Sequence, residues 1–187
     1  GMKIAIQEAI ETSALTLGSA VLFASFFQFN GWLFAELMYR EGVNWVFLPA
    51  GFRVILVLIL GLPGAMGIML GTWFLDRDSV GTSSMLLALV NGVVSGFTPL
   101  WVLKVLNRGK RTQHLLQDMT PQRLLNFTLI FAAASAVAHH LVWLLLERAD
   151  VNIWVDVWPM FIGDAIGALL MLYGFKLLLS RIKIKRL

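Results

Sequence analysis

Long apolar stretches recur along the chain, and they constrain its fold more than any other feature. A helix that crosses a bilayer needs about 20 mainly apolar residues. Hydrophobic residues make up 58% of the sequence and charged residues only 14%, whereas a soluble domain carries about 25% charged residues. We therefore predict an all-α, polytopic membrane protein with one domain over residues 1–187, and not a soluble enzyme, a disordered chain or a DNA-binding module. The four clearest predicted spans are Ser13–Phe34, Ser84–Leu106, Leu124–Leu146 and Val157–Leu179.

A fifth apolar stretch, Trp45–Leu75, is too long for one span. As a single helix it would be about 46 Å long, against a hydrocarbon core of about 30 Å. It also contains Gly61-Leu62-Pro63-Gly64, a strong helix break. We divide it into Trp45–Leu60 and Pro63–Leu75, which either cross a thin region of bilayer or form a partly re-entrant hairpin. The prediction is a six-transmembrane-helix bundle in which spans two and three form a short hairpin.

The charged residues outside these stretches are distributed asymmetrically. Most of the 15 Lys and Arg residues lie near the N-terminus, between spans four and five, and after span six, whereas acidic residues dominate the opposite loops. Basic residues favour the cytoplasmic side of a membrane. Tryptophans gather near the opposite ends of the spans, as expected for rings that prefer a membrane interface. We therefore predict that both termini are cytoplasmic.

Glycines one helical turn apart occur in three of the predicted spans. This spacing lets helix backbones approach closely in lipid. We expect these glycines to serve helix packing within one bundle, with a homodimer seam as the alternative. Because they lie inside apolar helices, they do not form a nucleotide-binding loop. The pairs are Gly67 and Gly71, Gly92 and Gly96, and Gly163 and Gly167.

Several polar side chains lie within the predicted spans, where a charge costs roughly 2.5–3.5 kcal/mol. Arg53 and Asp164 each lie about 12 Å below the outer ends of their helices, counting about 1.5 Å per residue. The two charges therefore share one layer in the outer half of the membrane. Other spans supply further polar residues to this layer in the outer half of the membrane. His139 and His140 lie at nearly the same depth, Asn91 lies somewhat deeper, and Gln28 and Asn30 lie near the outer end of span one.

Two roles for this polar layer stay open. Arg53 and Asp164 either neutralise each other and hold the bundle together, or line a ligand or ion pocket open to the outer face. In the pocket, an anionic group of the ligand is expected to meet Arg53. A further alternative places the Arg53 guanidinium at the interface by snorkelling. Adjacent helical residues point about 100° apart, so at most one of His139 and His140 faces a shared centre.

Catalytic and metal-binding patterns are missing from the sequence. It has no cysteine, no HExxH or GxSxG motif, and no paired carboxylates on one helix. Four serines could act as nucleophiles only beside a base: Ser83, Ser84, Ser95 and Ser135. Serines inside spans usually bond back to the preceding turn. The polar layer offers too few ligands for a metal ion. We expect no catalytic residue, cofactor, metal or nucleic-acid partner.

The Gly- and Pro-containing segments together resemble a known family. The stretch Asn44–Arg53, followed by an apolar run and then Leu62–Gly71, resembles the membrane-associated sensor (MASE) domains of bacteria. Those domains show a Trp, then Pro-x-Gly, an apolar helix and a second Pro-Gly element. The last span, Trp158–Gly167, is similar to that family's Gly-Asp-x-x-Gly segment, and the span with Asn91-Gly92 and Pro99 is a looser match. These motifs cover about half of the chain in the family's order.

The resemblance implies a multi-pass sensory or ligand-binding module of the bacterial inner (plasma) membrane. Such domains are usually fused to signalling enzymes, but this sequence ends shortly after its last predicted span, so we expect a stand-alone module. The alternative is the substrate-binding membrane subunit of a small-solute (vitamin-type) transporter, which has a similar size and six spans. The expected partners are the lipid bilayer, an unknown small ligand and a separate signalling or energy-coupling membrane protein.

Overall fold

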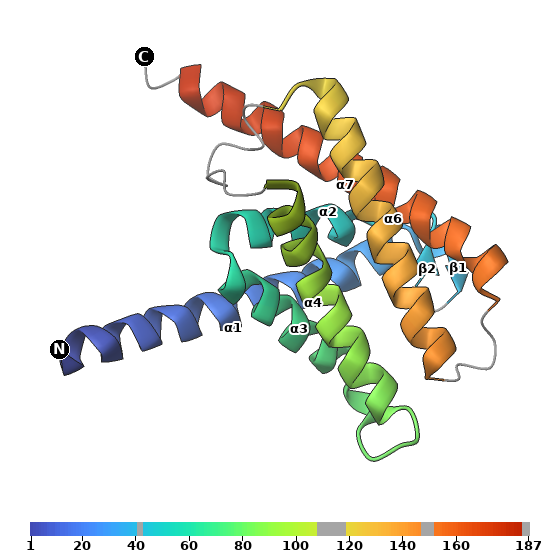
Figure 1. Ribbon diagram of the computed structural model, residues 1–187, viewed down its shortest axis with the longest axis horizontal. Coiled ribbons are helices and arrows are strands. Elements are labelled where there is room, and N and C mark those ends of the chain that lie inside the picture. Colours follow the sequence, from blue (N-terminus) through green and yellow to red (C-terminus); the bar gives the residue numbers. More distant parts are fainter. Residues whose placement is uncertain (41–42, 108–118, 147–151, 185–187) are drawn as a thin grey trace.

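The computed structural model describes residues 1–40, 43–107, 119–146 and 152–184. A two-stranded antiparallel hairpin of β1 (Met38–Arg40) and β2 (Val43–Asn44) follows the first helix. Single turns of 3-10 helix occur at Ala35–Leu37 and Arg77–Ser79. The rest of the regular structure in these ranges is α-helical (Figure 1). The helices are α1 (Met2–Leu33), α2 (Leu48–Leu60), α3 (Leu62–Leu75), α4 (Met85–Asn107), α6 (Pro121–Leu145) and α7 (Ile153–Ile184).

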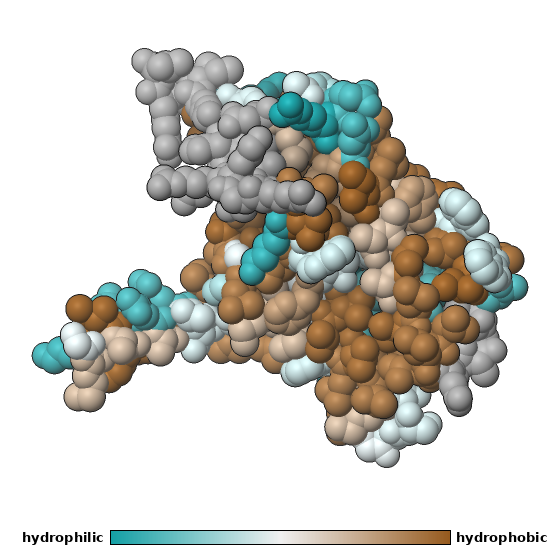
Figure 2. All heavy atoms as spheres, in the orientation of Figure 1, coloured by the Kyte–Doolittle hydropathy of each residue, from teal (hydrophilic) through white to brown (hydrophobic). Residues whose placement is uncertain are grey.

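The length and composition of the helices indicate a membrane-embedded protein. Among the described residues, four helices are long and apolar enough to cross a membrane: α1, α4, α6 and α7. The helices α2 and α3 are also apolar but have only 13 and 14 residues. Apolar side chains cover the face that α4 and α6 present in Figure 2, which suits contact with lipid. The all-α fold is therefore confirmed, the four long apolar helices are compatible with a membrane-embedded protein, and six complete crossings stay a prediction.

Helix boundaries differ from the predicted spans mainly where polar residues continue a helix. The helix α1 begins at Met2 and not near Ser13, because its first turns are helical without being uniformly apolar. Residues 1–15 are exposed and project from the bundle (Figure 1). The prediction that the second span begins at Trp45 is wrong. That helix starts at Leu48, where Pro49 occupies the first turn and needs no hydrogen-bond acceptor.

The predicted helical hairpin of α2 and α3 is present, and its turn lies at the predicted break. Gly61 adopts a φ of 63°, a left-handed conformation that favours glycine. Pro63 follows in the first turn of α3. A Cβ atom on Gly64 would lie 2.5 Å from the Leu56 carbonyl oxygen, so a larger residue there would push α3 away from α2.

The helix α2 occupies the centre of the bundle. It contacts α1, α3, α4 and α7, while the outer helices contact one another in the order α1, α3, α4, α6 and α7. The β-hairpin, the α3–α4 connection and the start of α7 lie toward one end of the bundle, which we call the hairpin end (Figure 1). The Gly61 turn, the end of α4 and the start of α6 lie toward the other. Side chains at the middle of α2 are therefore surrounded by helices on all sides.

Candidate functional site

Arg53 and Asp164, the two charges predicted to share a layer, meet in the centre of the bundle. Arg53 on α2 is 2% exposed and Asp164 on α7 is 1% exposed. Nη2 of Arg53 lies 3.8 Å from Oδ2 of Asp164 and donates a hydrogen bond of 3.2 Å to Oγ of Ser135 on α6. The guanidinium carbon also lies 5.8 Å from the ring centres of Phe47 and Phe131, within the range of cation–π attraction. Snorkelling of Arg53 to the interface is therefore excluded in this structure.

Two glycines of α7 allow this meeting. A Cβ atom on Gly163 would lie 1.8 Å from the Asn44 carbonyl oxygen, and one on Gly167 would lie 1.8 Å from that of Phe47. The backbone N–H of Phe47 also donates to the Gly163 carbonyl at 3.1 Å. Residues 44–47 therefore lie directly on the surface of α7, and they place the start of α2 so that Arg53 reaches Asp164.

The other predicted packing glycines also face segments of the same chain. Gly67 and Gly71 of α3 lie against α1, where added Cβ atoms would come within 3 Å of backbone oxygens of residues 16 and 20. Gly92 of α4 faces the Trp73 ring, and Gly96 faces the Ala65 carbonyl oxygen, both on α3. In the structure, these glycines bring helices of one bundle together.

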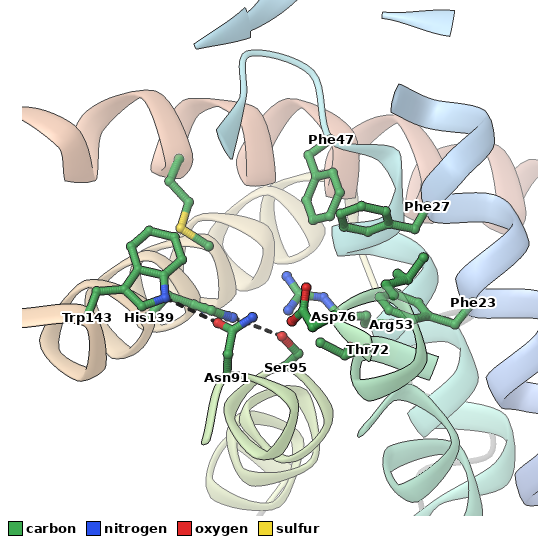
Figure 3. Close-up of a pocket in the computed structure, with 12 residues that line it drawn as sticks. Phe23, Phe27, Phe47, Arg53, Thr72, Asp76, Asn91, Ser95, His139 and Trp143 are labelled. Atoms are coloured by element: carbon green, nitrogen blue, oxygen red, sulfur yellow. Dashed lines mark hydrogen bonds between the residues drawn. The ribbon is translucent and has the colours of Figure 1, made fainter. Parts of the chain in front are cut away.

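A cavity of about 90 Å³ lies beside Arg53, between a cluster of phenyl rings and the polar side chains of α4 and α6 (Figure 3). A buried water needs about 10–15 Å³ of such space, and an apolar cavity of about 150 Å³ accommodates benzene. The cavity therefore has room for several waters or one small solute. Its polar lining consists of Arg53, Thr72, Asp76, Asn91, Ser95 and His139, and its apolar lining of Phe23, Phe27, Phe47, Leu75, Trp143 and Met160.

Of the two adjacent histidines, one lines the cavity, in agreement with the helix geometry. Nδ1 of His139 lies 2.7 Å from the Ser135 carbonyl oxygen, which only accepts, so Nδ1 is the protonated nitrogen. In the neutral ring, Nε2 then accepts the hydroxyl proton of Ser95 at 3.0 Å. His140 does not line the cavity. It is buried among α6 and its neighbours, donates from Nδ1 to the Ala136 carbonyl and packs on the Trp143 ring.

Asn91 lines the cavity as predicted, and several neighbours complete the polar wall. Its Oδ1 atom accepts a hydrogen bond of 3.3 Å from Nε1 of Trp143. Ser95 follows Asn91 by one helical turn, a spacing in the sequence that indicates a shared face. Asp76 is one of the acids of the loops opposite the basic segments, but it is the C-cap residue of α3 and is half-buried at the cavity. Its inward position has no signal in the local sequence.

The expectation that Gln28 and Asn30 join the polar layer is wrong. Gln28 is exposed on the surface of α1. Asn30 is fully buried, but its side chain makes hydrogen bonds with backbone groups and does not line the cavity. Its Nδ2 donates to the Val46 carbonyl at 3.2 Å, and its Oδ1 accepts from the Leu48 N–H at 3.0 Å. Leu48 is the first residue of α2, whose N–H groups have no partner within the helix. Asn30 therefore caps α2 from the neighbouring helix.

The hairpin end is closed by Asp156, the acid in the first turn of α7. Its Oδ1 accepts from the Tyr39 hydroxyl at 2.8 Å, and its Oδ2 lies 3.3 Å from Nη1 of Arg40. Oδ2 also accepts from the backbone N–H of Asn152 at 2.8 Å. The hydrogen bond to this carboxylate raises the pKa of the Tyr39 phenol above its usual value. These contacts tie the β-hairpin to the start of α7.

The cavity contains a serine–histidine pair without a carboxylate that orients the ring. Ser95 and His139 lie at the distance of a nucleophile and its base. However, a backbone carbonyl and not a carboxylate orients the ring, and the positive charge of Arg53 on the same cavity opposes an imidazolium. Among the described residues, no group of three or more His, Asp and Glu side chains is arranged to hold a metal ion.

The guanidinium of Arg53 makes few polar contacts with the described residues. Within the described part of the chain, its guanidinium makes one hydrogen bond, to Ser135, and its Nε has no hydrogen-bond partner. Comparison of the chain with protein-family models, curated proteins and solved structures gives no match.

Proposed function

We propose that this chain is a ligand-binding sensory module of the bacterial inner membrane, of the MASE type, without catalytic activity or a cofactor. The observation that carries the proposal is a polar cavity lined by a buried Arg53 whose N–H donors are mostly unused. Burying an arginine is costly unless its donors are satisfied. An anionic group on a small ligand forms charge-assisted hydrogen bonds with a guanidinium. Arg53 therefore supports a site for a small molecule that carries such a group.

The position of Arg53 gives ligand binding a route to a signal. The ion pair with Asp164 joins the central helix α2 to α7, and Asp164 does not line the cavity. A ligand that engages Arg53 competes with Asp164 and changes the interaction between these two helices. A ligand shifts a conformational equilibrium when it binds one state better than the other. A separate signalling membrane protein would read the shift.

Small carboxylates are expected to stabilise the purified protein in lipid nanodiscs. Formate, acetate and glycine serve as probes, and the thermal unfolding midpoint is the measurement. The double variant Arg53→Gln/Asp164→Asn keeps the net charge of the chain and is expected to fold, but the probes should not raise its midpoint. The matched control is Arg77→Gln/Asp78→Asn, which neutralises two exposed residues of the turn after α3 and should respond as the wild type. A wild type that none of the probes stabilises, or a double variant that responds fully, would contradict the proposal.

A sensory module binds its ligand without moving it across the membrane. Proteoliposomes that contain the purified chain in their membrane should therefore accumulate no more labelled probe than protein-free liposomes do. Uptake, or copurification from native membranes with an energy-coupling complex, would replace the sensory role by that of a transport subunit.

We further propose six crossings with the hairpin end outside and both termini in the cytoplasm. Lys104 is in the last turn of α4, and Lys176 and Arg181 are in the C-terminal part of α7; these helix ends lie toward the end opposite the hairpin (Figure 1). The basic positions 108, 110, 111, 185 and 186 fall outside the described residues. The chain has no cysteine, so single cysteines report topology directly. Ser83→Cys, after α3, should react with an impermeant maleimide from outside, and Ser180→Cys, which is also exposed, should react only after the membrane is opened. Labelling in the reverse order contradicts the orientation, and outside labelling of Leu62→Cys contradicts the position of the α2–α3 turn.

A further inference from the structure

The apolar side of the cavity points to a more specific ligand, and we propose that it is a short aliphatic monocarboxylate, with propionate as the best fit. Its carboxylate pairs with Arg53, and its alkyl chain lies against the phenyl rings of the cavity. This inference rests on the proposed function, since it assumes that the cavity takes an anionic ligand at Arg53.

Three phenyl rings of the lining form a continuous apolar surface beside Arg53, which we call the phenyl wall. The ring centres of Phe23 and Phe27 lie 6.2 Å apart, and those of Phe27 and Phe47 lie 5.5 Å apart. The guanidinium carbon of Arg53 lies 5.8 Å from the ring centre of Phe47, so the charge is at one edge of this wall. A carboxylate on Arg53 therefore places the chain attached to it next to the rings, where the burial of each methylene favours binding.

The hydrogen-bond donors that remain for a ligand are few. The hydroxyl protons of Ser95 and Thr72 are already donated to acceptors within the chain. Asn91 uses its Oδ1 as an acceptor, which leaves its Nδ2 hydrogens as donors. Figure 3 shows Asn91 across the central space from the phenyl wall. Together with Arg53, Asn91 offers donors for one carboxylate, and the opposite side of the cavity offers apolar contact.

The lining also limits the charge of the ligand. Among the described residues that line the cavity, Arg53 is the only lysine or arginine. Asp76 also lines the cavity, but it already interacts with another group of the chain, so we assign it no contact with the ligand. A second carboxylate on the ligand would therefore meet no second cation, and an unpaired charge in a buried site costs free energy. A monocarboxylate suits the site better than a dicarboxylate.

The size of the cavity limits the length of the alkyl chain. Its volume is about 90 Å³, whereas an apolar cavity of about 150 Å³ accommodates the ring of benzene. Propionate is smaller than benzene and fits the space, and hexanoate, with a chain as long as the benzene ring has carbons, does not. Affinity should therefore rise with chain length only over the first members of the series.

Titration calorimetry on the full chain in nanodiscs at neutral pH tests the inference, with the heat from protein-free nanodiscs subtracted. We expect the affinity to rise about fourfold from formate to acetate and again to propionate, the effect of one buried methylene. Hexanoate should bind more weakly than propionate. Malonate has the chain length of propionate but a second carboxylate, and propionamide has the same shape without the charge. Both should bind about tenfold more weakly than propionate, the loss expected for an unpaired charge or a missing charge-assisted hydrogen bond.

A variant of the apolar lining tests where the alkyl chain lies. Leu75 lines the cavity and is half-buried, so Leu75→Ala should enlarge the apolar side and raise the affinity for pentanoate relative to propionate. The matched control is Phe74→Ala, which shortens the neighbouring side chain that is 56% exposed. The control should keep the ratio of the wild type. An unchanged ratio in Leu75→Ala overturns the placement of the chain along the apolar lining.

The outcomes separate this inference from the proposed function. Equal affinities for formate, acetate and propionate overturn the role of the alkyl chain, while the anion-binding site at Arg53 stands. Malonate binding as tightly as propionate overturns the single charge of the ligand and also leaves that site in place. Propionamide binding as tightly as propionate, or failure of every carboxylate to bind, overturns both proposals. The chain-length series uses only the wild type, so it does not depend on the folding of a variant.

Discussion

Replacing Asp164 alone with leucine is expected to destabilise the protein by about 3–5 kcal/mol, the cost of leaving a buried charge without its partner. Arg53 would keep its positive charge at 2% exposure, with one hydrogen bond to Ser135 and no carboxylate at 3.8 Å. The double variant Arg53→Met/Asp164→Leu removes both charges and replaces them by apolar side chains of similar length. Such replacements of buried ion pairs are often neutral or stabilising. The double variant should therefore recover most of the stability.

The free energy of unfolding of each variant in detergent, measured by denaturant titration, tests whether Arg53 and Asp164 act as a pair. Asp78→Leu is the control, because it removes an exposed carboxylate and should change stability by no more than about 0.5 kcal/mol. A double variant that is as unstable as Asp164→Leu would mean that the two charges do not act as a pair. A single variant no less stable than the control would mean that Arg53 is solvated through the cavity and does not need Asp164.

Replacing Gly167 with alanine is expected to lower the free energy of unfolding by about 1–3 kcal/mol, the usual penalty for an added carbon in a packed interior. The new Cβ atom would lie 1.8 Å from the Phe47 carbonyl oxygen, and backbone atoms yield less readily than side-chain ends. Residues 44–47 would have to move away from α7, which displaces the start of α2. Because Phe47 lines the cavity and Arg53 follows six residues later, ligand stabilisation should be lost together with stability.

Gly174 on the same helix provides the matched control. Nothing lies within 4 Å of a Cβ atom built there. Gly174→Ala should leave the unfolding midpoint unchanged or raise it, since alanine favours helix over glycine by about 1 kcal/mol. Equal midpoints for the Gly167 and Gly174 variants would show that residues 44–47 do not need their close approach to α7.

The depth of a residue in the bundle followed from the sequence. Each helical residue adds about 1.5 Å along the axis, so counting from the ends of apolar stretches placed Arg53 and Asp164 in one layer. The same reasoning located the α2–α3 turn, because a left-handed glycine and a proline in the next turn leave few other conformations. The depth of a residue along its helix and the position of a helix break depend on residues that are close in the sequence. Both can therefore be predicted without a structure.

The direction in which a side chain points about its helix axis was predicted less well. Gln28 and Asn30 lie at the expected end of α1, but the helix turns Gln28 outward and Asn30 onto the backbone before α2. The periodicity of α1 is weak, because lipid and protein both accept apolar side chains, so no face is marked as the inner one. Helix geometry alone allowed at most one histidine to face the centre. The choice of His139 required the contacts of α6 with α4.

Composition, the order of apolar stretches and the position of glycine and proline were enough to predict an all-α membrane protein with a broken helical hairpin, and with Arg53 and Asp164 in one layer. The central position of α2 and the burial of the two charges came from the structure. Contacts between helices, which only the structure shows, place Asp76 at the cavity and Asn30 at the start of α2. They also tie Asp156 to the β-hairpin and bring Ser95 within hydrogen-bond distance of His139. These features link residues that are distant along the chain, such as Tyr39 and Asp156. Their positions depend on the rotation of each helix against its neighbours, which side-chain packing sets and local sequence does not encode.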